Sequence, residues 1–108
     1  MTVFQKRESL RKNRYVRAKA TALRLADILA GRYRARRIIL IGSLTNEDRF
    51  DLHSDIDIAV EGLDSENYFR ACGDLMMCAE DFDVDLVPVE NATPRMKSKI
   101  SHGEVLYG

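Results

Sequence analysis

The chain has 108 residues, of which 45% are hydrophobic, and its 17 basic and 17 acidic residues give a formal net charge of zero. This length supports one hydrophobic core, so we expect a single domain over residues 1–108. No apolar run could span a membrane, and the charged N-terminus lacks a signal segment, so we predict a cytoplasmic protein with no membrane contact. The sequence has no zinc-binding motif, because its cysteines and histidines lie apart at Cys72, Cys78, His53 and His102. We expect both thiols to be reduced.

The charges divide between the two parts of the chain. Residues 1–37 contain twelve Lys and Arg against two acidic residues, and residues 38–108 contain five against fifteen. One explanation is a solvated basic helix that balances an acidic body. The other is a basic face that meets an anion, such as a polyphosphate or an acidic partner protein.

The first predicted element is a long helix over Ser9–Gly31, with Ser9 as its N-cap and Gly31 as its stop. It belongs to a basic N-terminal segment, residues 1–36, that precedes the core of the domain, residues 37–108. Four residues recur near helical spacing and are expected to pack on a sheet: Val16, Ala20, Leu23 and Ala30.

Two strands follow, on either side of a polar segment. Ile38–Ile41 is a continuous apolar run, typical of a strand covered on both faces, and Gly42 and Ser43 form a turn after it. A short helix after Ser43 and then a loop are expected before the second strand, Asp55–Val60. Asp55 and Asp57 point to the same side of that strand, because side chains alternate along an extended chain.

The second half of the chain predicts a helix, a strand and a further helix. Ser65–Ala79 has helical composition, with Ser65 as its cap and four side chains available to the core: Tyr68, Phe69, Leu75 and Met76. Phe82–Val87 alternates strictly, so Asp83 and Asp85 share one face, and Pro88 closes the strand. Thr93–Ile100 is a short helix with Thr93 as its cap and Pro94 at its first position, and Val105–Tyr107 is a candidate edge strand.

Alternating strands and helices indicate an α/β domain built on a small sheet. If the strands carrying Asp55 and Asp57 and either Asp83 or Asp85 are neighbours, three carboxylates can share one or two Mg²⁺ ions, which prefer oxygen ligands. A turn at Gly42 and Ser43 that opens a helix would hold a phosphate through its N–H groups. Carboxylates, magnesium and a phosphate cradle together indicate phosphoryl or nucleotidyl transfer.

These residues resemble the minimal nucleotidyltransferases of bacteria and archaea, members of the DNA polymerase β-like superfamily. The resemblance is carried by Ile-Gly-Ser at 41–43, Ser-Asp-Ile-Asp-Ile-Ala-Val-Glu-Gly-Leu at 54–63, Val-Asp-Leu-Val at 84–87 and Gly-Glu-Val-Leu-Tyr at 103–107. It implies the fold of that superfamily, a small mixed sheet flanked by helices.

The resemblance also assigns roles by position. It implies that Gly42 and Ser43 bind the triphosphate of a nucleotide and that Asp55, Asp57 and Asp85 hold Mg²⁺, with two ions expected. Asp85 would be the third catalytic carboxylate and assist the attacking hydroxyl, a choice that alternation alone leaves open between Asp83 and Asp85. Members usually continue Gly-Ser with a small residue and Arg-Gly, whereas this chain has Leu-Thr-Asn-Glu-Asp-Arg, so Arg49 is the candidate substitute for nucleotide binding.

Members of the family are often encoded beside a HEPN-domain toxin, and some transfer AMP from ATP to a tyrosine of that toxin. The resemblance therefore implies an antitoxin that is a Mg²⁺-dependent adenylyltransferase with a HEPN partner. The alternatives are an inactive module that neutralises its partner by binding, and a nucleic-acid-binding domain, which the acidic half of the chain disfavours. The sequence leaves the nucleotide, the acceptor and the formation of a homo-oligomer open.

Overall fold

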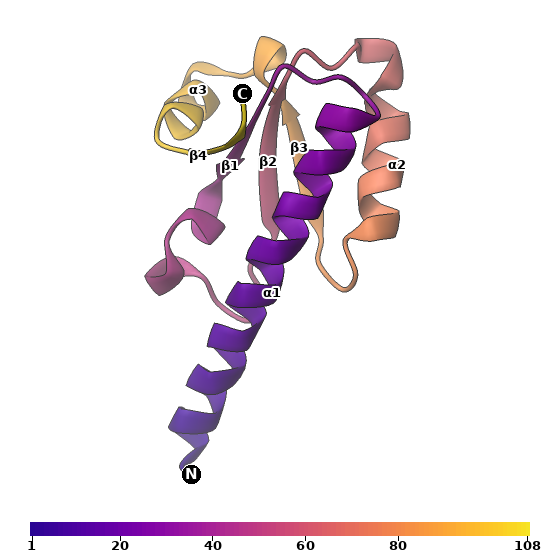
Figure 1. The fold of residues 1–108 in the computed structure, drawn as a ribbon. Coiled ribbons are helices and arrows are strands. Elements are labelled where there is room, and N and C mark those ends of the chain that lie inside the picture. The colour runs from indigo at the N-terminus through magenta and orange to yellow at the C-terminus, as the bar shows by residue number, and fades with distance from the viewer.

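The computed structural model describes residues 1–108 and has a four-stranded sheet with helices on both faces (Figure 1). Its helices and strands in chain order are α1 (Val3–Gly31), β1 (Arg37–Ile41), β2 (Ile56–Glu61), α2 (Tyr68–Cys78), β3 (Val84–Pro88), α3 (Pro94–Ser101) and β4 (Glu104–Tyr107). The strand order is β3-β2-β1-β4, and only β2 and β3 run parallel. The predicted α/β domain with a small mixed sheet is confirmed. None of the helices combines the length and apolar character that crossing a bilayer requires.

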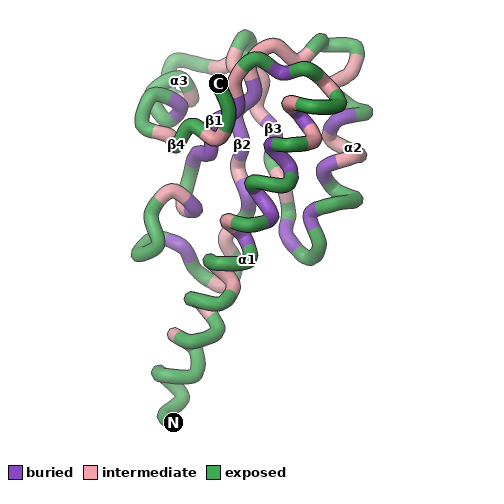
Figure 2. Tube along the Cα trace, viewed as in Figure 1, coloured by how far each residue is buried: buried purple, intermediate pink, exposed green.

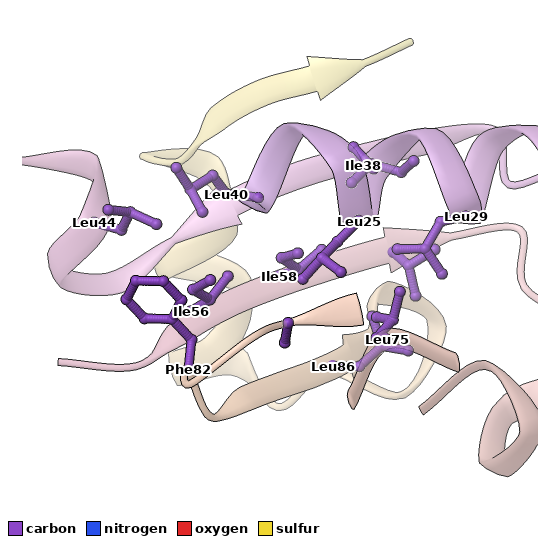
Figure 3. Close-up of a cluster of buried hydrophobic side chains, with 14 of the residues drawn as sticks. Leu25, Leu29, Ile38, Leu40, Leu44, Ile56, Ile58, Leu75, Phe82 and Leu86 are labelled. Carbon is purple, nitrogen blue, oxygen red and sulfur yellow. The ribbon is translucent and has the colours of Figure 1, made fainter. Parts of the chain in front are cut away.

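The two faces of the sheet bury different clusters of side chains. The larger cluster lies between the sheet and the helices α1 and α2, and it includes Leu25, Ile58 and Leu86 (Figure 3). The smaller cluster, which includes Ala59 and Ile100, lies under α3 on the other face. Because neighbouring residues of a strand point to opposite faces, each central strand contributes to both clusters.

α1 begins six residues before the predicted Ser9. The Thr2 side chain accepts a hydrogen bond from the backbone N–H of Gln5, and the Gln5 side chain accepts one from the backbone N–H of Thr2. This reciprocal capping box satisfies two N–H groups that would otherwise lack a partner at the helix start. The Thr-x-x-Gln pattern was present in the sequence, so the position of the helix start was predictable.

The predicted core stripe of α1 was wrong. Val16, Ala20 and Leu23 are exposed and Ala30 is only half-buried. The residues that α1 buries are mostly small: Ala18, Thr21, Ala22, Leu25, Ala26 and Leu29. Small side chains let the helix backbone lie close to the sheet, and their size gave no signal that distinguished this face from the outer one.

α2 is shorter than the predicted helix Ser65–Ala79. Ser65–Asn67 forms a separate 3₁₀ turn, and α2 starts at Tyr68 with no side-chain cap, so Ser65 is not the cap. The helix buries Ala71 and Leu75, whereas Phe69 and Met76 are exposed. The prediction that Phe69 and Met76 enter the core was wrong because the sequence offers apolar residues on two faces of this helix.

The strand boundaries shift by one or two residues from the predicted ones. β2 starts at Ile56, so Asp55 lies just before the strand, and β3 spans Val84–Pro88 in place of Phe82–Val87. Pro88 belongs to the strand and pairs with Val60. It is tolerated there because β3 is at the edge of the sheet, where a missing N–H removes no ladder hydrogen bond on the open side.

β4 is the predicted edge strand, and Gly103 brings it against β1. A Cβ atom on Gly103 would lie 2.5 Å from Ile39 Cγ2 and 2.6 Å from the Leu40 carbonyl oxygen. The turn between α3 and β4 therefore has no room for a side chain at this position. The helix α3 itself is capped by Thr93 and begins at Pro94, as predicted.

We expect Gly103→Ala to lower the free energy of unfolding by about 1–3 kcal/mol, because the new methyl group overlaps β1. The matched control is Gly73→Ala on α2, where nothing lies within 4 Å of the added Cβ. That substitution should stabilise the protein by about 0.5–1 kcal/mol, because alanine loses less backbone entropy in a helix. Urea titration measures both changes, and equal effects of the two would contradict this explanation.

Candidate active site

The parallel pairing of β2 with β3 sets two carboxylates side by side. Asp57 is the register partner of Asp85, and neighbouring strands are about 4.8 Å apart. Both residues point to the face of the sheet that also holds Ala59 and α3, since Ile58 and Leu86 pack in the cluster on the other face. Asp55, just before β2, adds its charge near the same point.

Gly42 gives space to one of these carboxylates. Asp57 is also the register partner of Ile41, the last residue of β1. At Gly42 the chain turns with a φ of +79°, and a Cβ atom there would lie 2.6 Å from Asp57 Oδ2. A positive φ favours glycine, and here the absent side chain also keeps the position beside Asp57 open. Gly42 is thus required both by the turn and by the carboxylate.

The Asp57 carboxyl group is in an unfavourable environment for a negative charge. Burial raises the pKa of Asp57 above its ordinary value, and the charges of Asp85 and Asp55 raise it further, while Lys99 lowers it. Partial burial and like charges both favour the neutral form of a carboxyl group. A bound cation would relieve the same strain.

A basic cleft lies next to Gly42. It has a volume of about 280 Å³ and is lined by Gly42, Thr45, Arg49, Ser98, Lys99, His102 and Gly103. Its three basic side chains come from the loop after β1 and from the C-terminal end of α3. His102 Nδ1 lies 2.8 Å from the Ser98 carbonyl oxygen, and because a carbonyl oxygen only accepts, Nδ1 carries the proton and leaves Nε2 free.

Ser43 lies at the start of the 3₁₀ turn Gly42–Thr45 that follows β1 directly. N–H groups at the beginning of such a turn have no partner within it. The short helix predicted after Ser43 is thus present, and the cleft beside it also contains the exposed guanidinium of Arg49.

Sequence reasoning missed Lys99 and His102. Both lie on or just after α3, at least 50 residues after Arg49, the nearest predicted site residue of the loop, and only the packing of α3 on the sheet brings them to Gly42. One signal was available. The arginine that the resemblance led us to expect after Gly-Ser is missing, which predicts that cationic groups come from elsewhere in the chain.

The residues fit a hard divalent cation by their chemistry. Asp55, Asp57 and Asp85 supply carboxylate oxygens, the ligands that Mg²⁺ prefers. Burial and then the charges of Asp85 and Asp55 raise the pKa of Asp57, so a cation there would be favourable. No group of three or more His, Cys, Asp or Glu side chains lies close enough together to form a metal site as the side chains stand. The backbone register nevertheless brings Asp57 and Asp85 side by side.

Asp83 and Asp85 differ in position. Asp85 is within β3 and directly beside Asp57, whereas Asp83 precedes the strand and its backbone carbonyl accepts a hydrogen bond from the N–H of Ile56. Asp83 also makes no contribution to the shifted pKa of Asp57. The largest cavity of the molecule, about 640 Å³, lies at the other end of the sheet around Arg36, Gly62 and Tyr68, away from these carboxylates.

Comparison with known proteins agrees with this geometry. The profile of the family described as polymerase beta, nucleotidyltransferase, matches residues 24–108. The chain belongs to the polymerase β nucleotidyltransferase family. The match covers the whole sheet, α2, α3 and the C-terminal part of α1. No sequence among curated proteins gave a significant match.

Solved structures of this nucleotidyltransferase family resemble the chain over most of its length. A toxin–antitoxin complex named MntA–HepT is 26% identical with a TM-score of 0.61, covering 83% of this chain and 72% of that one. A toxin–antitoxin structure with AMP-PNP is 28% identical, with a TM-score of 0.65 and coverage of 80% and 73%. A complex of an MNT antitoxin with a tri-AMPylated HEPN toxin from Shewanella oneidensis is 27% identical, with a TM-score of 0.63 and coverage of 84% and 72%. The predicted resemblance to minimal nucleotidyltransferases is confirmed.

The raised pKa of Asp57 predicts a pH dependence of stability. Between the unfolded and the folded pKa, the folded protein binds more protons than the unfolded chain, so the free energy of unfolding falls as pH rises through that window. In EDTA, we therefore expect Asp57→Asn to be more stable than the wild type at pH 7, with a smaller difference below pH 4. Thermal unfolding at a series of pH values measures this, and a variant that is less stable at pH 7 would contradict it.

Proposed function

We propose that this nucleotidyltransferase transfers AMP from ATP to a hydroxyl group, most plausibly a tyrosine of a HEPN-type toxin, and so acts as its antitoxin. The observation that carries the proposal is the pairing of Asp57 with Asp85 beside the open Cα of Gly42. A carboxylate pair next to a basic cleft has separate places for an attacking hydroxyl and for a polyphosphate leaving group. The family match supports nucleotidyl transfer as the reaction.

The reaction balances with groups that this chain supplies. The acceptor oxygen forms a bond to the α-phosphorus of ATP, and the bond from that phosphorus to the bridging oxygen of pyrophosphate breaks. The acceptor proton passes to the carboxylate of Asp85, which faces solvent and has room for a substrate beside it. The products are the AMP ester of the acceptor, pyrophosphate and a proton.

The basic cleft is suited to the phosphates that leave. Arg49, Lys99 and His102 line it together with Gly42, and charge-assisted hydrogen bonds from such groups to phosphate are among the stronger polar contacts in proteins. Ser43, at the start of the 3₁₀ turn, is the proposed donor of a backbone N–H and a hydroxyl to the same phosphates. In this proposal Lys99 and His102 take the part of the missing arginine.

Asp55, Asp57 and Asp85 are the proposed ligands of Mg²⁺. When bound, the ion would neutralise their charge and that of the phosphates and stabilise charge that develops during transfer. The separate contribution of the chain is to hold Asp57 against Gly42 and Asp85 beside it, so that the acceptor and the α-phosphorus meet in a fixed orientation.

The proposed partner follows from the similar structures. One of them contains an AMPylated HEPN toxin bound to an MNT antitoxin, and another is a toxin–antitoxin structure with AMP-PNP. A toxin that presents its own tyrosine would bring the acceptor hydroxyl to the carboxylates.

Transfer of label from α-labelled ATP to a HEPN-domain protein of the same organism tests the proposal. We expect Asp57→Asn and Asp85→Asn each to reduce the rate at least about 100-fold, the scale on which positioned acid–base groups act. Asp83→Asn removes an equally exposed carboxyl group just outside the pair and should retain most of the rate. No labelling by the wild type with ample Mg²⁺ would overturn the proposal.

The same variants separate transfer from simple binding. An inactive module that neutralises its toxin by contact predicts that Asp57→Asn protects cells from the toxin as well as the wild type does. The proposed function predicts that protection is lost with labelling, while the complex of the two proteins still forms.

Lys99 gives a second test, directed at the phosphate cleft. We expect Lys99→Gln to raise the KM for ATP by about tenfold, because a lost charge-assisted hydrogen bond costs about 1.5–3 kcal/mol. Lys97→Gln is the matched control, since Lys97 lies on the same short helix but lines a different hollow with Ile39 and Val105. An equal change in KM for both variants would show that the cleft at Gly42 does not hold the phosphates.

A further inference from the structure

The stripe by which α1 packs on the sheet continues past the edge of the sheet. Its members recur in steps of three or four along the whole helix: Phe4, Arg7, Arg11, Tyr15, Ala18, Ala22, Leu25 and Leu29. From Ala18 onward the stripe is covered by the core, and Tyr15 packs edge-on against Phe50 at 5.6 Å between ring centroids. Phe4 therefore occupies a core-facing position at which the domain provides nothing to cover it.

We call the first eight residues of α1, Val3–Leu10, the arm. Glu8 of the arm forms an ion pair with Arg11 on the same helix, and no side chain of the arm makes a hydrogen bond or ion pair with an element beyond α1 and its Thr2 cap. The last anchor before it is Arg11, which donates hydrogen bonds to the carbonyl oxygens of Glu47 and Phe50. The arm extends about 12 Å at the rise of an α-helix and projects beyond the sheet with its surface exposed (Figure 2). Phe4 is 77% exposed and Leu10 is 50% exposed.

The arm stands at the same end of the sheet as the candidate active site. A groove of about 370 Å³ lies between its Phe4 and Arg7 and the loop residues Asp51, Leu52 and His53. That loop leads directly into Asp55 and β2. A protein that lies on the arm and in this groove would therefore be at the end of the sheet where the carboxylates lie.

The charges of the arm remain available to a partner, unlike most of the basic residues of this segment. Seven of the twelve in residues 1–37 form ion pairs with acidic residues of the body: Arg14, Arg17, Lys19, Arg24, Arg32, Arg36 and Arg37. Lys6, Arg7 and Lys12 have no such partner. The division of charge along the chain is thus largely satisfied within the fold. The five basic residues that do not pair with the body are Arg34 near β1, Arg11, which pairs with Glu8 on the same helix, and Lys6, Arg7 and Lys12 in and just after the arm.

These features favour a protein over a nucleic acid as the occupant. Exposed Val3, Phe4 and Leu10 need an apolar pocket, which a folded protein offers and a phosphate backbone does not. Three unpaired basic side chains are few for a nucleic-acid site, because nucleic-acid binding depends on many contacts between basic side chains and phosphates. The family match begins at residue 24, so the arm lies outside the part of the chain that the family profile matches.

We propose that the arm is the docking surface for the protein substrate of the active site. The partner would present an apolar pocket for Phe4 and Leu10, rimmed by carboxylates that face Lys6 and Arg7. The identity of this partner as the AMP acceptor rests on the proposed function. The end of α1 lacks tertiary contacts, and short helical segments without such contacts have marginal stability in water. Docking would therefore stabilise the helical conformation of the arm.

The test measures the dissociation constant between the full chain and a HEPN-domain protein of the same organism, by calorimetry. We expect Phe4→Ala with Leu10→Ala to raise the dissociation constant about tenfold or more, since truncation of interface anchors commonly costs over 1 kcal/mol. The matched control is Val16→Ala with Leu23→Ala, which removes side chains that are 65% and 52% exposed on the outer face of the same helix. The control should bind within about twofold of the wild type, by the same conversion.

Labelling of the HEPN protein keeps the two proposals apart. If the arm variant binds as the wild type does, or the control loses as much affinity, docking by the arm is wrong even when AMP transfer proceeds. If the HEPN protein is never labelled but its affinity still depends on Phe4 and Leu10, docking holds and AMP transfer fails. Salt-dependent binding of a single-stranded RNA that depends on Phe4 and Leu10, with toxin affinity unchanged, would overturn the proposal in favour of nucleic acid.

Discussion

The parallel pairing of β2 with β3 is the constraint on which the candidate site depends. Parallel strands in register place equivalent residues side by side, so Asp57 and Asp85, far apart in the chain, must share one position on the sheet. Burial of the apolar residues on the opposite face fixes that register, because a slip by one residue would exchange Ile58 and Leu86 with the carboxylates. The stability of the core and the geometry of the acidic pair therefore have the same origin.

The cost of this arrangement is concentrated at Asp57, whose pKa is raised by burial and by its acidic neighbours. Natural proteins retain such groups where function needs them, and a shifted carboxyl group in a cleft is a recognised indicator of a functional site. Gly42 and the basic cleft lie next to Asp57, so negative and positive side chains lie close together in the fold. This separation of charge over a short distance is what nucleotidyl transfer requires.

α1 has two roles along its length. Its C-terminal part belongs to the shared domain and packs small side chains closely against the sheet, and its N-terminal part leaves the domain altogether. Ion pairs to Glu80, Asp81 and Glu104 hold the helix in one direction, although exposed ion pairs add little stability individually. The direction of the helix is what takes the arm to the end of the sheet where the carboxylates lie.

Local patterns in the chain were enough to predict the α/β class and the order of the elements, since alternation and turn residues are properties of short segments. Alternation also placed Asp55 and Asp57 on one side of their strand, but it left Asp83 and Asp85 open, and the pairing of β2 with β3 sets Asp85 beside Asp57. Local patterns were not enough to choose the buried face of α1, where alanines carry no size signal, or to find Lys99 and His102. Those two residues reach Gly42 only because α3 folds back over the sheet. Contacts between distant segments depend on packing, which periodicity within one segment does not record.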